Sequence, residues 1–234
     1  LAEILAMWGC RVETLEGALQ RALEGCGQVV GVVADAGVGK SRLCLEFVES
    51  CRLRWIKVYE AHCPAHGQSL HLLPVFELLR GIFGITEADG DEVVREKIAG
   101  RLLLLDRSFD ETLPLVWEFL GVPDPARPAP IVDAAVRQRQ LFTFMRRLQE
   151  ARSVREPAIL LFDDLHWIDP GSDVFVAQIV ECVQSTRTLL LLNFRPEYRA
   201  DWMARSYYQQ LPLAVLGPDA IRALAVDLLG AHPS

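Results

Sequence analysis

Short apolar runs that end in glycine or polar residues recur along the chain. Residues 29–33 form one such run, and residues 158–162 form another that ends in two carboxylates. Continuous aliphatic runs of this length are typical of parallel strands with both faces covered. The same reasoning predicts further strands at 54–61, 187–194 and 211–216.

Between these runs, apolar residues follow helical spacing. The pattern predicts helices at 3–24, 41–51, 131–155, 172–184 and 219–229, and a helical insertion at 69–120 with helices at 72–83, 92–105 and 113–120. Residues 121–130 contain four prolines and are expected to form an extended linker, because proline cannot continue a helix. On the helix at 131–155, the arginines expected to stay largely in solvent are Arg137, Arg139, Arg146, Arg147 and Arg152.

Composition places the chain among globular proteins. Its 234 residues, 51% of them hydrophobic, suffice for a sizeable core. The net charge of -7 argues against a general nucleic-acid surface, which needs clustered basic residues. No apolar run approaches the roughly 20 residues that span a bilayer. Six cysteines without a CxxC pair indicate reduced thiols, so we expect a soluble, cytoplasmic protein.

The first strand leads into a turn typical of a phosphate-binding loop. Gly37 and Gly39 permit backbone angles that turn successive N–H groups toward one concave side, where they can bind phosphate oxygens. Lys40 is expected to reach the β- and γ-phosphates of a nucleotide, and Ser41 to hold Mg²⁺ at the start of the next helix. The residues expected to contact the nucleotide are Ala34, Asp35, Ala36, Gly37, Val38, Gly39, Lys40, Ser41 and Arg42.

This loop departs from the usual GxxxxGK[ST] pattern at its first position, where Ala34 replaces glycine. An added methyl group is small, so the phosphate cradle is expected to persist. The turn is strained or shifted only if that position needs a backbone angle that glycine alone adopts easily. The alternative is an ordinary strand-turn-helix connection.

The run at 158–162 ends in Asp163 and Asp164, a Walker B pattern. Asp163 is expected to hold the hydration shell of Mg²⁺, and Asp164 to orient or deprotonate the attacking water. A surface turn is the alternative, which the preceding phosphate-binding loop disfavours. The strand at 54–61, between the two motifs, favours the P-loop NTPases in which a second strand is inserted beside the first.

Polar residues also follow the run that starts at position 187. Ligands of open α/β sheets bind at the carboxyl ends of the strands. Arg195, and also Asn193, are therefore expected to reach the γ-phosphate and respond to its presence. The alternative for Arg195 is a residue that only caps its strand.

Three strings together resemble the AAA-like ATPase module of STAND-type signalling NTPases. They are residues 28–43, the string LFDDLHWIDP at 161–170, and NFRPEY at 193–198. The likeness is greatest to modules that follow class III adenylate/guanylate cyclase domains in bacterial proteins, and it extends to large LuxR-type regulators. It covers nearly the whole chain, although the glycine-arginine element usual near the start is altered around Cys10.

The resemblance implies a three-layer α/β P-loop NTPase of the ASCE type, with a five-stranded parallel sheet and the helical insertion. It implies ATP and Mg²⁺ as ligands and a γ-phosphate sensor at Arg195. One domain is expected over 1–234, and it is expected to be a fragment of a longer protein. The segment 1–234 is expected to lack the helical lid and the C-terminal winged-helix parts of its relatives.

Relatives use ATP binding and slow hydrolysis as a switch, so a regulatory ATPase module is the favoured function. Expected partners are ATP and ADP, with neighbouring cyclase or helical-repeat domains and self-association as further options, and without direct nucleic-acid or membrane binding. A nucleotide-binding scaffold without turnover is the alternative. A small-molecule kinase has less support, because no second substrate site is evident.

Overall fold

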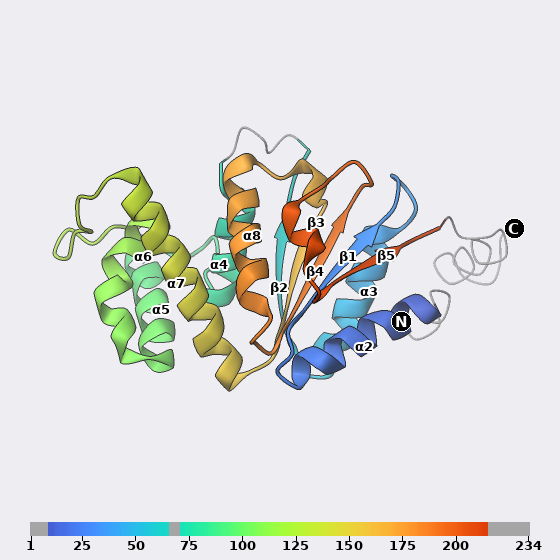
Figure 1. Cartoon of the computed structure of the whole chain (residues 1–234). Coiled ribbons are helices and arrows are strands. Elements are labelled where there is room, and N and C mark those ends of the chain that lie inside the picture. Colours follow the sequence, from blue (N-terminus) through green and yellow to red (C-terminus); the bar gives the residue numbers. More distant parts are fainter. Residues whose placement is uncertain (1–8, 66–70, 215–234) are drawn as a thin grey trace, which may run out of the picture.

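A five-stranded sheet forms the centre of the computed structural model, which describes residues 9–65 and 71–214 (Figure 1). The strand order is β2-β3-β4-β1-β5, and every neighbouring pair is parallel. The strands are β1 (Gln28–Val33), β2 (Lys57–His62), β3 (Ala158–Asp163), β4 (Thr188–Phe194) and β5 (Tyr208–Pro212). The predicted five-stranded parallel sheet is therefore confirmed.

Helices cover both faces of this sheet (Figure 1). They are α2 (Cys10–Leu23), α3 (Lys40–Leu53), α4 (Leu73–Phe83), α5 (Asp91–Leu105), α6 (Leu113–Phe119), α7 (Ala134–Arg155) and α8 (Pro170–Val183). Three short 3-10 helices follow α5, β3 and β4, namely η2 (Arg107–Thr112), η3 (Leu165–Trp167) and η4 (Asp201–Ala204). The helix predicted at 219–229 lies outside the described residues.

Alternation along the strands divides the buried side chains into two cores. Val30 and Val32 of β1 pack with α2 and α3 on one face. Val29 and Val33 of the same strand pack on the other face, with α4, α7 and α8. Because both faces are buried, the strands carry continuous apolar runs. The three-layer α/β arrangement predicted from the sequence is confirmed.

The helical insertion begins against the sheet and then leaves it. Helix α4 packs along β2, whereas α5, η2 and α6 form a lobe beside α7, beyond the β2 edge (Figure 1). Residues 121–130, which join α6 to α7, contain no helix or strand, as their prolines predict. Asp133 then caps α7, because its side-chain oxygen accepts a hydrogen bond from the backbone nitrogen of Val136 at 2.8 Å.

The predicted position of the second strand is wrong. Strand β2 does not lie beside β1 but forms an edge of the sheet, paired with β3. The inserted strand beside β1 is β4, which pairs with it from Gln28 to Val33. After β1 and α3 the chain crosses to the far edge, and β3 and β4 later fill the space between. This order depends on long-range connections that a local pattern does not contain.

Two strand boundaries also differ from prediction. Strand β2 begins at Lys57 rather than at 54, because Trp55 has a φ of 62°, which is incompatible with an extended strand. Strand β5 begins at Tyr208 rather than at 211. Its exposed Gln209 and Gln210 break the apolar pattern, since β5 is an edge strand beside β1.

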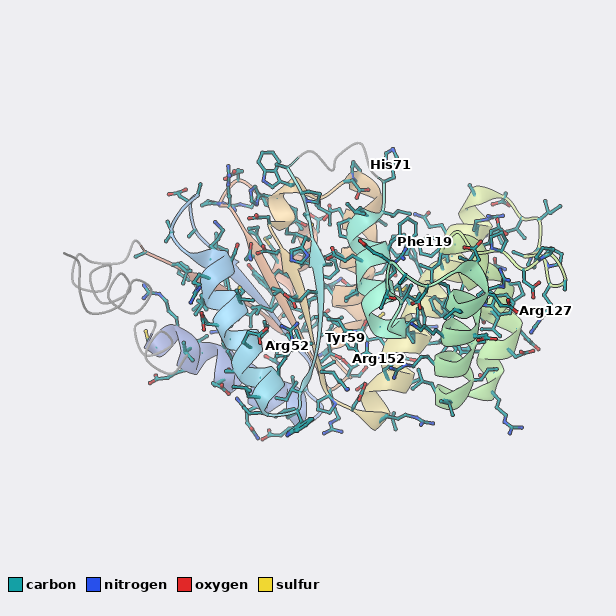
Figure 2. All side chains as sticks on the ribbon, turned by 180° about the vertical axis from the view of Figure 1, so that it is seen from behind. Arg52, Tyr59, His71, Phe119, Arg127 and Arg152 are labelled. Carbon is teal, nitrogen blue, oxygen red and sulfur yellow. The ribbon has the colours of Figure 1, made fainter. Side chains whose placement is uncertain are left out.

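Arg152 is the exception among the α7 arginines expected in solvent. It is buried, with 8% of its surface exposed. Its guanidinium carbon lies 4.4 Å from the centre of the Tyr59 ring on β2, and Figure 2 shows the two side chains together. The prediction failed because the insertion covers this side of α7.

Two expectations from composition can be compared with the fold. None of the helices in residues 9–65 and 71–214 has both the length and the hydropathy needed to cross a membrane. All six cysteines are free thiols; Cys44, Cys51 and Cys63 are buried, whereas Cys10 and Cys26 are exposed.

Candidate nucleotide-binding site

The loop between β1 and α3 has the backbone that the glycine pattern predicts. Gly37 and Gly39 have φ values of 77° and 100°, in the left-handed region that favours glycine. A Cβ placed on Gly37 would meet no heavy atom within 4 Å, so glycine is required here by its backbone angle and not by crowding. Gly39 precedes α3 without a side-chain cap, which leaves helix N–H groups for an anion.

Ala34 does not strain this loop. Its φ is not positive, and its backbone nitrogen donates to the carbonyl oxygen of Phe194 at 3.4 Å, which continues the pairing of β1 with β4. The alanine methyl is therefore accommodated as in an ordinary strand residue, and the change from glycine leaves the turn itself to Gly37 and Gly39.

Lys40, at the start of α3, lies under the loop. Its amine donates to the carbonyl oxygens of Ala34 at 2.9 Å and Asp35 at 3.0 Å. Burial lowers the pKa of Lys40, and the carboxylates of Asp164 and Asp163 act in the opposite direction. The positive charge therefore lies in the field of both Walker B aspartates, where a phosphate group would also bring negative charge.

The other loop residues differ in their surroundings. Ser41 is exposed on the first turn of α3, as a ligand to a metal ion requires. Val38 packs partly against the core between the sheet and α3. Arg42 forms an ion pair with Glu46 one turn later, so the structure directs it along α3, and its contact with a nucleotide stays a prediction.

Asn193 joins the two Walker B aspartates. Its side-chain oxygen accepts a hydrogen bond from the backbone nitrogen of Asp164 at 2.8 Å, and its amide nitrogen donates to the Oδ1 atom of Asp163. Asn193 is fully buried and lies opposite Val32 of β1 in the sheet register. Because β4 lies between β1 and β3, this one amide lies beside the phosphate-binding strand and contacts both the Asp163 carboxylate and the Asp164 backbone.

Asp164 has an uncommon backbone conformation. Its φ of 55° and ψ of 43° place it in the left-handed region, which aspartate tolerates better than most residues. This angle ends β3 and begins η3. Asp163 is therefore the last residue of the strand, whereas Asp164 belongs to the turn that follows it.

His166, on η3, is buried beside this site. Only 4% of its side chain is exposed, and neither ring nitrogen has a hydrogen-bond partner among the described residues. Its Nδ1 atom lies 3.8 Å from the Oδ1 atom of Asp164. Burial lowers the pKa of His166. The ring centre of Trp167 lies 5.0 Å from that of His166, which agrees with a packing role for this histidine.

Arg195 follows β4 at the same edge of the sheet. Its guanidinium carbon lies 5.4 Å from the centre of the Trp167 ring, and its Nη1 atom lies 4.0 Å from a carboxylate oxygen of Glu197. About a third of its side chain is exposed. The contact with Trp167 holds Arg195 over η3, near both Lys40 and His166, whose pKa values it lowers.

A sequence model of the AAA ATPase domain matches residues 10–192. The chain belongs to the AAA ATPase domain family. The matched segment contains the loop, both Walker B aspartates and all of the helical insertion. Membership supports an ATPase that binds ATP with a divalent metal.

Individual relatives of this AAA ATPase domain are distant. An uncharacterized protein of Rhizobium meliloti (strain 1021), R02095, is 27% identical over 201 residues. The match covers 86% of this chain and 19% of that protein, so the chain spans about a fifth of its relative's length.

Two solved structures are also similar to this chain. They are the structure of Drosophila ORC bound to DNA (12% identity, TM-score 0.45) and that of Drosophila ORC bound to GC-rich DNA and Cdc6 (10% identity, TM-score 0.44). Each match covers 94% of this chain, and 45% and 61% of the respective solved chains.

The residues of this AAA ATPase domain fit ATP and a divalent metal. The left-handed turn at Gly37 and Gly39 and the uncapped start of α3 suit phosphate oxygens. The exposed Ser41 hydroxyl and the Asp163 carboxylate are oxygen ligands of the kind that Mg²⁺ prefers. Lys40, Asn193 and Asp164 complete the surroundings. The predicted residues from all three strand ends therefore gather at the carboxyl edge of the sheet.

A pair of residues at this edge was not predicted. His62, at the end of β2, lies opposite Asp163, and its Nδ1 atom is 2.7 Å from a carboxylate oxygen of Glu77 on α4. The hydrogen bond that Glu77 accepts from the ring raises the pKa of His62, and the charge of Asp163 adds to this effect. No sequence spacing relates His62 to Glu77, because their contact depends on the packing of α4 against β2.

Proposed function

We propose that this AAA ATPase domain binds ATP with Mg²⁺ at the 34–41 loop, hydrolyses it slowly and thereby acts as a switch within a longer signalling protein. The observation that carries the proposal is the position of Asn193, which bridges Asp163 and Asp164 beside the loop strand. A surface turn without function does not need a fully buried amide that binds the carboxylate of one aspartate and the backbone N–H of the next.

In this proposal, the protein acts by positioning charge. The loop N–H groups and Lys40 bind the phosphates, Ser41 and Asp163 hold the metal, and Arg195 approaches the γ-phosphate. The carboxylate of Asp164 orients the attacking water and accepts its proton. Magnesium, when bound, would neutralise part of the phosphate charge. The amine of Lys40 exchanges its contacts with the Ala34 and Asp35 carbonyl oxygens for phosphate oxygens.

The setting of the module is part of the same proposal. The chain spans about a fifth of the length of its Rhizobium meliloti relative, which leaves room there for further domains. We infer neighbouring cyclase or helical-repeat domains, a cytoplasmic location, and no direct nucleic-acid contact by this segment. Self-association through the nucleotide site is a further option. Expression of the longer gene product tests these points directly.

A nucleotide-binding scaffold without turnover is the second candidate. It is favoured by the contacts of Lys40, whose amine is already bound by two carbonyl oxygens of its own loop, so that ATP must displace them. On this view, nucleotide binding alone changes the contacts with neighbouring domains.

Phosphate release distinguishes the two candidates. The ATPase proposal predicts Mg²⁺-dependent release of phosphate that falls about 100-fold or more in Asp164→Asn, with ATP affinity changed by less than about threefold. The matched control is Asp173→Asn, a carboxylate of α8 that binds the Tyr198 hydroxyl at 2.6 Å. Release that is the same in the parent and in Asp164→Asn would favour the scaffold.

A further inference from the structure

Arg152 is a buried cation without an acidic partner. Its side chain is almost wholly covered, and among residues 9–65 and 71–214 it forms no ion pair within 4.0 Å. The ring of Tyr59 covers one face of the guanidinium at 4.4 Å, and Figure 2 shows this contact at the β2 edge. A buried charge is costly unless it is paired. Because no carboxylate among the described residues pairs with Arg152, the N–H groups at the edges of its guanidinium are available to a ligand.

A cavity of about 180 Å³ adjoins Arg152. It lies between β2, α4, α5 and α7, and its apolar wall includes Phe83, Leu104 and Leu148. The charged lining consists of Arg101, Arg152 and Arg155 with a single carboxylate, Glu156. Three arginines against one glutamate leave the cavity with an excess of positive charge. Burial lowers the pKa of Arg152; Tyr59 and Glu156 oppose this effect, and the neighbouring Arg101 adds to it.

A second unpartnered donor lies on the other side of Arg152. The Nε2 atom of Gln149 is buried and has no hydrogen-bond partner among the described residues. A void of about 10 Å³, lined by Gln149, Leu148 and Arg152, separates it from the sheet. This space is about the size of one water molecule, so no larger group can reach the Gln149 amide through it.

The cavity is remote from the nucleotide loop. Helix α7 runs antiparallel to the strands, and Arg152 precedes the start of β3 by only six residues, at the end of the sheet opposite Asp163. The walls of the cavity come from the sheet edge, from α7 and from α5 of the insertion. A ligand there would bind the helical lobe and the sheet together, without contact with Lys40.

We propose that this cavity binds a small carboxylate with an aromatic or aliphatic body. The guanidinium groups of Arg152 and Arg101 bind the carboxylate, since the planar fork of arginine matches it in two parallel hydrogen bonds. The apolar side chains of Phe83, Leu104 and Leu148 contact the body of the ligand. The volume limits the ligand to about the size of a single substituted ring, and the bound ligand stabilises the packing of α5 against α7.

Calorimetric titration of the full chain with benzoate tests the proposal, with benzamide as the neutral analogue of the same shape. Benzoate should bind about tenfold more tightly than benzamide, because a charge-assisted pair replaces a neutral hydrogen bond. Inorganic phosphate should bind more weakly than benzoate, since it lacks the apolar body. Equal affinity for benzoate and benzamide, or tighter binding of phosphate, would overturn the proposal.

Variants locate the bound anion. Arg152→Met keeps the packing of the side-chain stem and should weaken benzoate binding about tenfold. Arg101→Gln should also weaken benzoate binding about tenfold. Because Arg101 lies at the exposed rim, this variant should fold normally, so it tests the site even if Arg152→Met is unstable. Arg146→Gln, an exposed arginine on the same helix, should change the affinity by less than about twofold. Unchanged affinity in both cavity variants, or lost binding in Lys40→Ala, would contradict the assignment.

Discussion

The side-chain oxygen of Asn193 accepts a hydrogen bond from the backbone nitrogen of Asp164 at 2.8 Å. The other end of the same amide donates to Asp163. An uncharged side chain from β4 thus binds the Asp163 carboxylate and the Asp164 backbone at the end of β3, next to the strand that carries the phosphate-binding loop. Both polar atoms of this buried amide are used within the site. Replacing Asn193 should therefore affect both hydrolysis and the stability of the fold, and different variants should separate the two effects.

Asn193→Asp should reduce hydrolysis more than nucleotide binding. The variant keeps an oxygen for the Asp164 N–H but replaces the donor to Asp163 with a like charge. We expect kcat to fall about 10- to 100-fold with ATP affinity within about threefold of the parent. Steady-state phosphate release together with a binding titration checks this, and wild-type turnover in the variant would show that Asn193 does not position the Asp163 carboxylate and the Asp164 backbone for hydrolysis.

Asn193→Ala should also lower the stability of the fold. It leaves the Asp164 N–H and the Asp163 carboxylate without this partner, which costs about 1–3 kcal/mol. Urea unfolding should therefore show a lower midpoint with an unchanged slope. A midpoint equal to that of the parent would mean that water replaces the amide at no cost.

Asp164→Gly should separate strain from catalysis. Because Asp164 has a φ of 55°, glycine at this position should raise the free energy of unfolding by about 0.5–1 kcal/mol. The same change removes the carboxylate that prepares water, so hydrolysis should fall about 100-fold or more. Denaturant unfolding and phosphate release measured on one preparation check both outcomes; a less stable and still active variant would contradict them.

Asp169, the last acidic residue of the LFDDLHWIDP string, has a structural role. It is 2% exposed, and its Oδ1 atom accepts from the backbone nitrogen of Ser172 at 3.0 Å, which caps α8. Asp169→Ala should therefore cost about 1 kcal/mol of stability and leave turnover per folded molecule unchanged. Asp133→Ala, which removes the cap of α7, is the matched control. A loss of turnover in Asp169→Ala alone would assign Asp169 to the site.

The pair of His62 and Glu77 predicts a pH-dependent contribution to stability. Donation of a hydrogen bond to the Glu77 carboxylate raises the pKa of His62 above 6.5. The contribution of His62 to stability is therefore fully present below pH 6.5 and is lost as pH rises through the raised value. Burial acts to raise the pKa of Glu77, but hydrogen bonding to His62 outweighs it and lowers this pKa below 4.5. The contribution of Glu77 to stability is therefore present above pH 4.5 and is lost as pH falls through the lowered value.

Glu77→Gln should therefore reduce stability most at about pH 5.5 and least at about pH 8.5. Both side chains are more than a third exposed, so the loss should stay below about 1 kcal/mol. Urea unfolding at the two pH values measures it. A loss that is equal at both values would show that the ion pair does not contribute.

Local sequence patterns predicted the parts of the site that depend on single strand ends. The glycine turn, Lys40 and the two aspartates follow from short segments, because a strand, a turn and a helix start are determined within about ten residues. The sequence left open whether Ala34 strains the loop, because the answer depends on a backbone angle. Its φ is not positive, so alanine fits this position without strain.

The remaining features depend on contacts between distant segments. The double link made by Asn193 requires β4 to lie between β1 and β3, and the sequence favoured 54–61 as the inserted strand instead. Likewise, Arg152 was expected in solvent because its helix is rich in arginine, whereas the packing of the insertion buries it. Periodicity along one element does not report which element covers it.

Binding of ATP by the parent and by Lys40→Ala tests the central claim most directly. Calorimetric titration in the presence of Mg²⁺ should show one site per chain in the parent, with affinity about 10- to 100-fold weaker in the variant, because the buried amine is the cation nearest to the loop carbonyls. Lys57→Ala, an exposed lysine at the start of β2, should bind as the parent does. Equal ATP affinity in the parent and in Lys40→Ala would contradict a nucleotide site at this loop.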